Sequence, residues 1–129
     1  MFQVLYIEDQ PDIQKILKFT LLASKKFNVE LADNGADGLR RAKELKPDLI
    51  LLDYSLPDMD GPAVLTALKQ SEVKHVPVAF VTAMTQADDL DRCRALGAVD
   101  IITKPFSPRD LPNRLLAILA AQGVRGAAS

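Results

Sequence analysis

Four short polar stretches stand directly after apolar runs in this 129-residue chain, and their residue types suggest chemistry on a charged group. The stretches are Glu8-Asp9, Asp53, Thr82 and Lys104. Three carboxylates in one place are typical of a site for a hard divalent cation, and Mg²⁺ fits best because it needs few protein carboxylates. An ammonium and a hydroxyl beside them could hold phosphoryl oxygens, and a central carboxylate could be the nucleophile that forms an acyl phosphate.

Asp53 occupies the most informative of these positions. It follows Leu49-Ile-Leu-Leu52, a continuous apolar run that is typical of a strand buried on both faces. A lone carboxylate is costly to bury, so we expect Asp53 at the carboxyl end of its strand, where open α/β sheets place their ligands. An aspartate here could equally cap a helix or serve a turn, so the rest of the chain must decide.

Five apolar or alternating runs predict strands, and a helical pattern follows each of them. The predicted strands are residues 2–7, 27–32, 49–52, 76–81 and 100–103. This strict alternation predicts a parallel sheet with helices on both faces. Parallel strands run in the same direction, so the polar stretches that follow four of them should meet at one edge of the sheet.

Several residues predict where the helices begin. Pro11 suits the first position of a helix, and Ile13, Ile16, Leu17, Thr20 and Leu21 then recur at helical spacing. Asp60 is a candidate N-cap for a helix after the Asp53 loop. Thr85–Asp88 and Ser107–Asp110 each match a capping box, and Pro112 could kink or delay the last helix.

The composition excludes several other classes of protein. The chain is 48% hydrophobic and 26% charged, which is typical of a soluble globular domain. A formal net charge of −1 gives no basic surface for nucleic acid, so we expect no direct contact with it. No apolar run approaches the roughly 20 residues of a membrane span, so we expect no membrane insertion. The single cysteine, Cys93, fits a reducing compartment, and we expect a cytoplasmic location.

Taken together, these motifs resemble the receiver domain of two-component response regulators over essentially the whole chain. The matching pieces are Glu8-Asp9, Asp53, Leu56-Pro-Asp-Met-Asp-Gly61, Thr82-Ala83, Gly97-Ala98 and Lys104-Pro105-Phe106. The resemblance implies an α/β, flavodoxin-like fold: a doubly wound five-stranded parallel sheet of order 2-1-3-4-5 with five helices. We assign residues 1–122 to the receiver domain and residues 123–129 to a tail or the start of a linker.

The resemblance also implies partners and an activity. Asp53 would accept a phosphoryl group from a sensor histidine kinase or a histidine phosphotransfer protein. Phosphorylation would switch a surface that contacts a downstream protein target. The chain would be a signalling phosphoacceptor that assists its own phosphorylation and dephosphorylation, and would not be an enzyme in the ordinary sense.

The family's site residues carry over to matching positions of this sequence. Asp9, Asp53 and the backbone carbonyl of Ser55 would bind Mg²⁺, and Glu8 would act through a metal-bound water. The residues that would hold the phosphoryl oxygens are Thr82, Ala83 and Lys104, with Ala83 kept small so that its N–H can approach. The resemblance further implies that the Lys104–Pro105 bond is cis, which costs little before proline.

One position departs from the usual pattern, and two others predict how fast the acyl phosphate is hydrolysed. The family usually has Tyr or Phe three residues before the lysine, and this chain has Ile101, which leaves the phosphorylation chemistry intact but predicts a different output coupling. Ser55 and Met84 stand where the family's side chains flank the path of the attacking water. Neither carries a charge or a carboxamide, and Met84 can cover the phosphoryl group, so we expect slow hydrolysis.

Two alternative functions share parts of this pattern. A phosphohydrolase with an aspartate nucleophile would also place an apolar strand before Asp53. That class needs a second aspartate two residues later, where this chain has Ser55. A receiver fold that serves only as an interaction module would be expected to lack a site residue, and every one is present.

Overall fold

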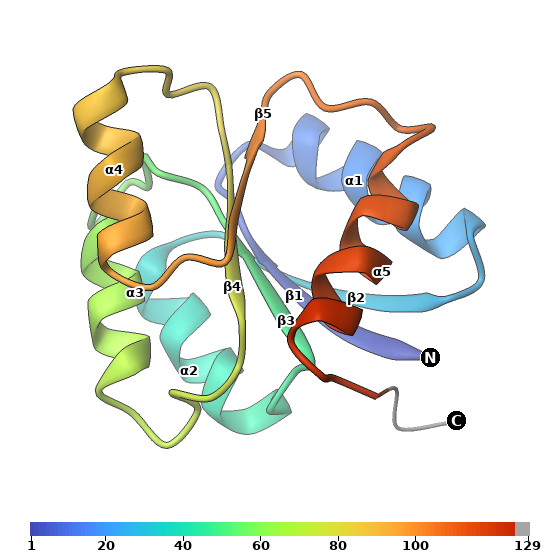
Figure 1. The fold of residues 1–129 in the computed structure, drawn as a ribbon, viewed down its shortest axis with the longest axis horizontal. Helices are drawn as coiled ribbons and strands as arrows, with labels where there is room; N and C mark the ends of the chain where they lie inside the picture. The colour runs from blue at the N-terminus through green and yellow to red at the C-terminus, as the bar shows by residue number, and fades with distance from the viewer. Residues whose placement is uncertain (126–129) are drawn as a thin grey trace.

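The computed structural model describes residues 1–125, which form a five-stranded parallel sheet between two layers of helices (Figure 1). The strands are β1 (Phe2–Ile7), β2 (Phe27–Ala32), β3 (Leu49–Leu52), β4 (Val78–Thr82) and β5 (Asp100–Thr103). The helices are α1 (Pro11–Ala23), α2 (Gly35–Leu45), α3 (Gly61–Lys69), α4 (Ala87–Ala95) and α5 (Leu111–Ala121). The strand order is β2-β1-β3-β4-β5 and all pairings are parallel, which confirms the predicted doubly wound, flavodoxin-like fold.

The sheet separates two hydrophobic cores. Helices α1 and α5 cover one face, and α2, α3 and α4 cover the other (Figure 1). The four residues of β3 alternate between the cores: Leu49 and Leu51 face α1 and α5, and Ile50 and Leu52 face the other three helices. All four are fully buried, and each contributes about 1.5–3 kcal/mol by leaving water. The prediction that the strand before Asp53 is buried on both faces is confirmed.

Two predicted helix starts are confirmed and two are wrong. Pro11 opens α1, and the Asp60 carboxylate caps α3 by accepting from the Ala63 N–H at 2.8 Å. Helix α4 begins after Gln86, which makes no side-chain cap bond, so the predicted Thr85–Asp88 capping box does not form. The Ser107 hydroxyl accepts from the Asp110 N–H at 3.3 Å, as the second capping box predicts, but this bond closes a separate turn and α5 starts only at Leu111. Pro112 has no N–H for the carbonyl four residues earlier, so the turn does not continue into the helix.

Two further predictions from hydrophobic pattern are corrected. Strand β4 begins at Val78, because the Val76 N–H turns back to the Val73 carbonyl at 3.0 Å. On α1, Ile16 was predicted to face the core, yet it is 53% exposed. Gln14 takes a buried position instead, because its amide nitrogen donates to the Glu8 carbonyl and, at 2.8 Å, to the Asp33 carboxylate.

The C-terminal segment is described as far as Arg125. The Val124 N–H donates to the Leu119 carbonyl at 2.9 Å, which holds the chain against the end of α5. Residues 126–129 of the predicted tail lie outside the described residues. Within residues 1–125, none of the helices combines the length and apolar character that crossing a bilayer requires.

Candidate functional site

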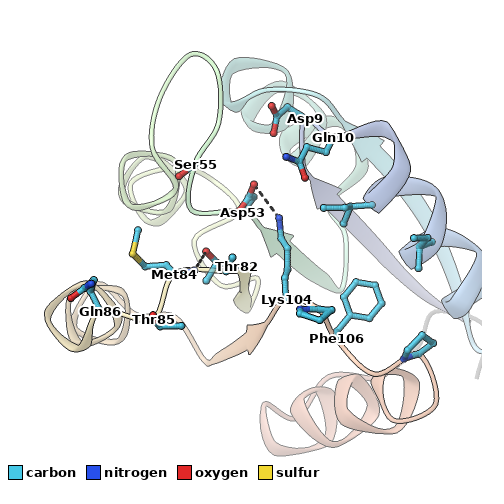
Figure 2. Close-up of a pocket in the computed structure, with 15 residues that line it drawn as sticks. Asp9, Gln10, Asp53, Ser55, Thr82, Met84, Thr85, Gln86, Lys104 and Phe106 are labelled. Carbon is cyan, nitrogen blue, oxygen red and sulfur yellow. Dashed lines mark hydrogen bonds and ion pairs between the residues drawn. The ribbon is translucent and has the colours of Figure 1, made fainter.

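The carboxyl ends of β1, β3, β4 and β5 converge under one open cavity of about 1050 Å³ (Figure 2). The predicted site residues that line it are Asp9, Asp53, Ser55, Thr82, Ala83, Met84 and Lys104. Glu8 lies beneath this surface and is fully buried. Ile101 is also buried, but it packs in the core on the α4 side of the sheet. The structure therefore brings together every residue predicted for the chemistry and keeps Ile101 apart from it.

Lys104 joins two carboxylates at the centre of the site. Its ammonium donates to Glu8 Oε1 at 2.5 Å and lies 3.4 Å from Asp53 Oδ2. The peptide bond that follows this lysine, between Lys104 and Pro105, is cis, as the resemblance implied. The shorter contact shows that the ammonium is held mainly by Glu8, although it still faces Asp53.

The neighbouring charges and burial shift the pKa values of Asp53 and Glu8 in opposite directions. Burial, followed by the negative charge of Glu8, raises the pKa of Asp53 to about 6. Burial also disfavours ionisation of Glu8, but its hydrogen bond and ion pair with Lys104 outweigh that cost, so the pKa of Glu8 is lowered. Glu8 is thus the carboxylate that Lys104 neutralises, and Asp53 is the one left short of positive charge.

The donor set at this edge fits a hard divalent cation. Carboxylate oxygens of Glu8, Asp9 and Asp53 all lie within 4.8 Å of one another. All three are oxygen ligands, which Mg²⁺ prefers, and Asp9 is exposed to the solvent that would supply the remaining water ligands. The raised pKa of Asp53 is a further sign that the cluster lacks positive charge.

Thr82 and the two residues after it form the wall opposite α1. Thr82 is buried, and its hydroxyl oxygen accepts from the Met84 N–H at 3.0 Å, so its own O–H can still donate to a group in the cavity. Ala83 is exposed and lines the same cavity. The Met84 side chain extends toward Ser55 at the mouth of the site (Figure 2). The wall combines a hydroxyl, a small residue and a flexible apolar arm.

The loop after Asp53 is held from two sides. The Asp58 carboxylate accepts from the Gly35 N–H at 2.7 Å and the Ala36 N–H at 2.8 Å, at the start of α2. Gly61 closes the loop, and a Cβ there would lie only 2.6 Å from the Asp53 carbonyl oxygen. The Gly61 N–H donates to the Tyr54 carbonyl at 2.6 Å. This loop therefore fixes the backbone that carries Asp53 and Ser55.

Sequence reasoning missed two side chains that support Glu8. The Tyr6 hydroxyl donates to Glu8 Oε1 at 3.0 Å, and the Gln14 amide donates to the Glu8 carbonyl. Burial and the adjacent Glu8 charge raise the pKa of Tyr6, which keeps the phenol neutral and able to donate. Strand alternation could have revealed Tyr6, because residues two apart share one face of a strand.

Comparison with known families matches most of the chain. The family model described as "Response regulator receiver domain" matches residues 4–116. The chain is 38% identical over 117 residues to the alkaline phosphatase synthesis transcriptional regulatory protein PhoP of Bacillus subtilis, covering 91% of this chain and 48% of that protein. It is 39% identical over 117 residues to the cell cycle response regulator CtrA of Brucella ovis, covering 91% of this chain and 50% of that protein. The chain thus spans about half the length of these relatives.

Solved structures support the same assignment. The chemotaxis response regulator CheY4 of Vibrio cholerae superposes with a TM-score of 0.83 at 28% identity, covering 92% of this chain and 98% of that one. A CheY-like response regulator receiver domain protein from Methanospirillum hungatei superposes with a TM-score of 0.87 at 26% identity, covering 95% of this chain and 97% of that one. Nearly the whole of each of those chains corresponds to this one.

Proposed function

Because the chain belongs to the response regulator receiver domain family, we propose that it is the phosphoacceptor of a two-component phosphorelay and that Asp53 carries the phosphoryl group. The donor is a sensor histidine kinase or a histidine phosphotransfer protein, and the phosphorylated domain contacts a downstream protein target. The observation that carries the proposal is the position of Asp53. It lies in the open cavity, 3.4 Å from the Lys104 ammonium and among the Glu8 and Asp9 carboxylates.

In the proposed reaction, an Asp53 carboxylate oxygen attacks the phosphorus of a phosphohistidine. The new P–O bond forms as the P–N bond breaks, and the histidine nitrogen keeps the bonding electron pair. Lys104 turns from Glu8 to a phosphoryl oxygen, a short move because its ammonium already lies close to both carboxylates. The Thr82 hydroxyl and the Ala83 N–H donate to the other oxygens.

Mg²⁺, held by Asp9, Asp53 and the Ser55 carbonyl with Glu8 acting through a bound water, would supply positive charge to the phosphoryl oxygens. The chain's own contribution is to hold three carboxylates in one place against their mutual repulsion. The same residues would assist hydrolysis of the acyl phosphate, so the domain would take part in both its phosphorylation and its dephosphorylation.

We also propose a cytoplasmic location, which the single buried thiol of Cys93 fits.

We place the domain at residues 1–122 and treat residues 123–129 as a tail or the start of a linker. The end of α5 at Ala121 supports this boundary. This chain corresponds to about half the length of PhoP and CtrA, and the downstream target is part of the proposal.

Intact-mass measurement after incubation with acetyl phosphate and Mg²⁺ tests the proposal. The wild-type protein should gain the mass of one phosphoryl group, and Asp53→Asn should lose most of that gain. Asp91→Asn, which changes a surface carboxylate on α4, is the matched control and should label like the wild type. Equal labelling of Asp53→Asn and the wild type would refute the assignment.

A further inference from the structure

Tyr6 is a buried tyrosine whose hydroxyl reaches the candidate cation site from inside the core. Tyr6 is fully buried, and its ring packs among apolar side chains of α1 and α5 such as Leu17 and Leu115. Tyr6 and Glu8 lie two residues apart at the end of β1, so their side chains project from the same face of the sheet. The Tyr6 hydroxyl donates to Glu8 Oε1 at 3.0 Å.

The hydroxyl adds nothing to the packing of this core that a phenylalanine ring would not supply. A buried hydroxyl without a partner is costly, and a buried carboxylate without donors is costlier still. Glu8 is fully buried, so the hydrogen bond from Tyr6 compensates both groups. The hydrogen bond between Tyr6 and Glu8 therefore serves the carboxylate at the site and is not needed for packing of the core.

The donors to Glu8 are not equivalent during the proposed reaction. Glu8 Oε1 accepts from Tyr6 and from Lys104, and Oε2 accepts from the Gln10 N–H at 3.3 Å. Lys104 also faces Asp53, and it must turn toward a phosphoryl group on Asp53. When it does so, the Tyr6 hydroxyl is the side-chain donor left on Oε1. The phenol cannot follow the lysine, because the surrounding core holds its ring in place.

We propose that Tyr6 is a positioning residue for the divalent cation: its buried hydroxyl holds the Glu8 carboxylate in place beside Asp9 and Asp53 when Lys104 moves away. This inference rests on the proposed function, since it assigns a role to Glu8 in cation binding. Hydrogen-bond partners of metal-binding side chains fix their orientation in the same way in other metal sites.

The test is a Mg²⁺ titration of wild type, Tyr6→Phe and Tyr54→Phe, measuring the rate of labelling by acetyl phosphate at each concentration. Tyr54→Phe is the matched control, because the Tyr54 hydroxyl also donates to a carboxylate, Asp89, outside the cation cluster. The half-saturating Mg²⁺ concentration of Tyr6→Phe should rise about tenfold, as expected when a metal-binding side chain loses its hydrogen-bond partner. Its maximal rate should stay within about twofold of wild type, whereas a loss of folding alone would lower only that rate.

Cation binding is also measured without phosphorylation, from the rise in thermal midpoint with added MgCl₂. The midpoint curve of Tyr6→Phe should shift to higher concentration by the same factor as the labelling curve, and that of Tyr54→Phe should not shift. A half-saturating concentration for Tyr6→Phe within about twofold of wild type in both assays would overturn the proposal.

A spectroscopic measurement keeps the inference testable even if Tyr6→Phe folds poorly. The chain has no tryptophan and two tyrosines, so Tyr6 is the sole fluorophore of this type in Tyr54→Phe. A hydrogen bond to a carboxylate quenches phenol emission, so the emission reports whether the Tyr6 hydroxyl still donates to Glu8 when the cation binds. Emission that stays quenched as MgCl₂ is added along the midpoint curve supports the role of Tyr6, and emission that rises along it shows that the bond to Glu8 is lost and overturns the role. Failure of wild type to label would instead count against the proposed function.

Discussion

The Tyr54 hydroxyl donates to Asp89 Oδ1 at 3.1 Å and so joins the residue after the proposed acceptor to the first turn of α4. The Tyr54 ring also packs on Phe80 of β4, with ring centroids 6.3 Å apart. We therefore expect a displacement of the Asp53 loop to reach α4 through the hydrogen bond and β4 through the ring contact. Ile101 offers no comparable route, because it is buried and its branched side chain restricts its rotation.

Binding of beryllofluoride with Mg²⁺, which mimics the phosphoryl group, should shift amide resonances mainly at Asp53, in residues 82–88 and at Lys104. The shift must come from a differential interaction of two states, here the contact of Thr82 with the phosphoryl mimic. Amides of β5 should change less, because Ile101 replaces the usual aromatic side chain. A rotamer change of Ile101 with large shifts across Asp100–Thr103 would show that β5 carries the signal after all.

Tyr54→Phe should reduce the beryllofluoride-dependent shifts at the start of α4, in residues 87–90, while leaving those at Asp53 and Thr82 in place. The variant removes only the hydroxyl that bonds Asp89 and keeps the ring on Phe80. The same spectra of wild type provide the comparison. Unchanged shifts in α4 would mean that the hydrogen bond does not couple the two elements.

Asp53→Asn should stabilise the metal-free protein at neutral pH. The pKa of Asp53 in the folded state is raised to about 6, so the folded protein binds this proton more tightly than the unfolded chain does. The wild-type free energy of unfolding should therefore fall as pH rises from about 4 to about 6, with Asp53 contributing at most about 3 kcal/mol to the loss.

Urea unfolding in EDTA across that pH range measures this effect. The free energy of unfolding of Asp53→Asn should fall less with rising pH and should exceed that of wild type at pH 7. That of Asp91→Asn should fall with pH as steeply as in wild type. Glu8 acts in the opposite direction, because its pKa is lowered and its contribution is lost as pH falls. Subtracting the wild-type free energy of unfolding from that of Asp53→Asn removes the contribution of Glu8, which both proteins share. A difference in this free energy that stays constant with pH would contradict the raised pKa of Asp53.

Most of the fold could be predicted from the sequence because its strongest signals are local. The apolar run of β3 and the alternation of strands and helices determine a parallel sheet, and parallel strands bring Glu8, Asp53, Thr82 and Lys104 to one edge. Helix starts were less predictable. Pro112, which lacks an N–H, delayed the start of α5, and Ile16 lost its core position to Gln14, whose amide donates to the ends of β1 and β2.

The supporting contacts of the site could not be predicted because they depend on residues far apart in the chain. Lys104 and Glu8 are separated by 96 positions, and whether the ammonium bonds Glu8 or Asp53 depends on a difference of under 1 Å between the two contacts. The bond between Tyr54 and Asp89 spans 35 positions and has no sequence pattern. Tyr6 is the exception, since its position two residues before Glu8 was visible in the sequence.

Mg²⁺ should raise the thermal midpoint of the wild-type protein, and Asp9→Ala should weaken that effect. Binding to the folded state alone stabilises it by about 2.7 kcal/mol at 100 times the dissociation constant. Asp9 is exposed and supplies one of three clustered carboxylates, so its removal takes away a ligand and also a repulsive charge. Without metal, Asp9→Ala should therefore melt no lower than wild type. A midpoint unaffected by millimolar Mg²⁺ in wild type would count against the cation site.

Met84→Glu should shorten the lifetime of the phosphorylated protein. Met84 lines the cavity on the same side as Ser55, so its thioether arm can cover a phosphoryl group on Asp53 and exclude water (Figure 2). A glutamate there would remove the apolar cover and could orient an attacking water by hydrogen bonding. Loss of the intact-mass phosphoryl signal after removal of acetyl phosphate measures the lifetime, with Met84→Leu as the control that keeps an apolar side chain. Faster loss for glutamate and near wild-type loss for leucine are expected, and an equal or longer lifetime for glutamate would show that Met84 does not shield the acyl phosphate.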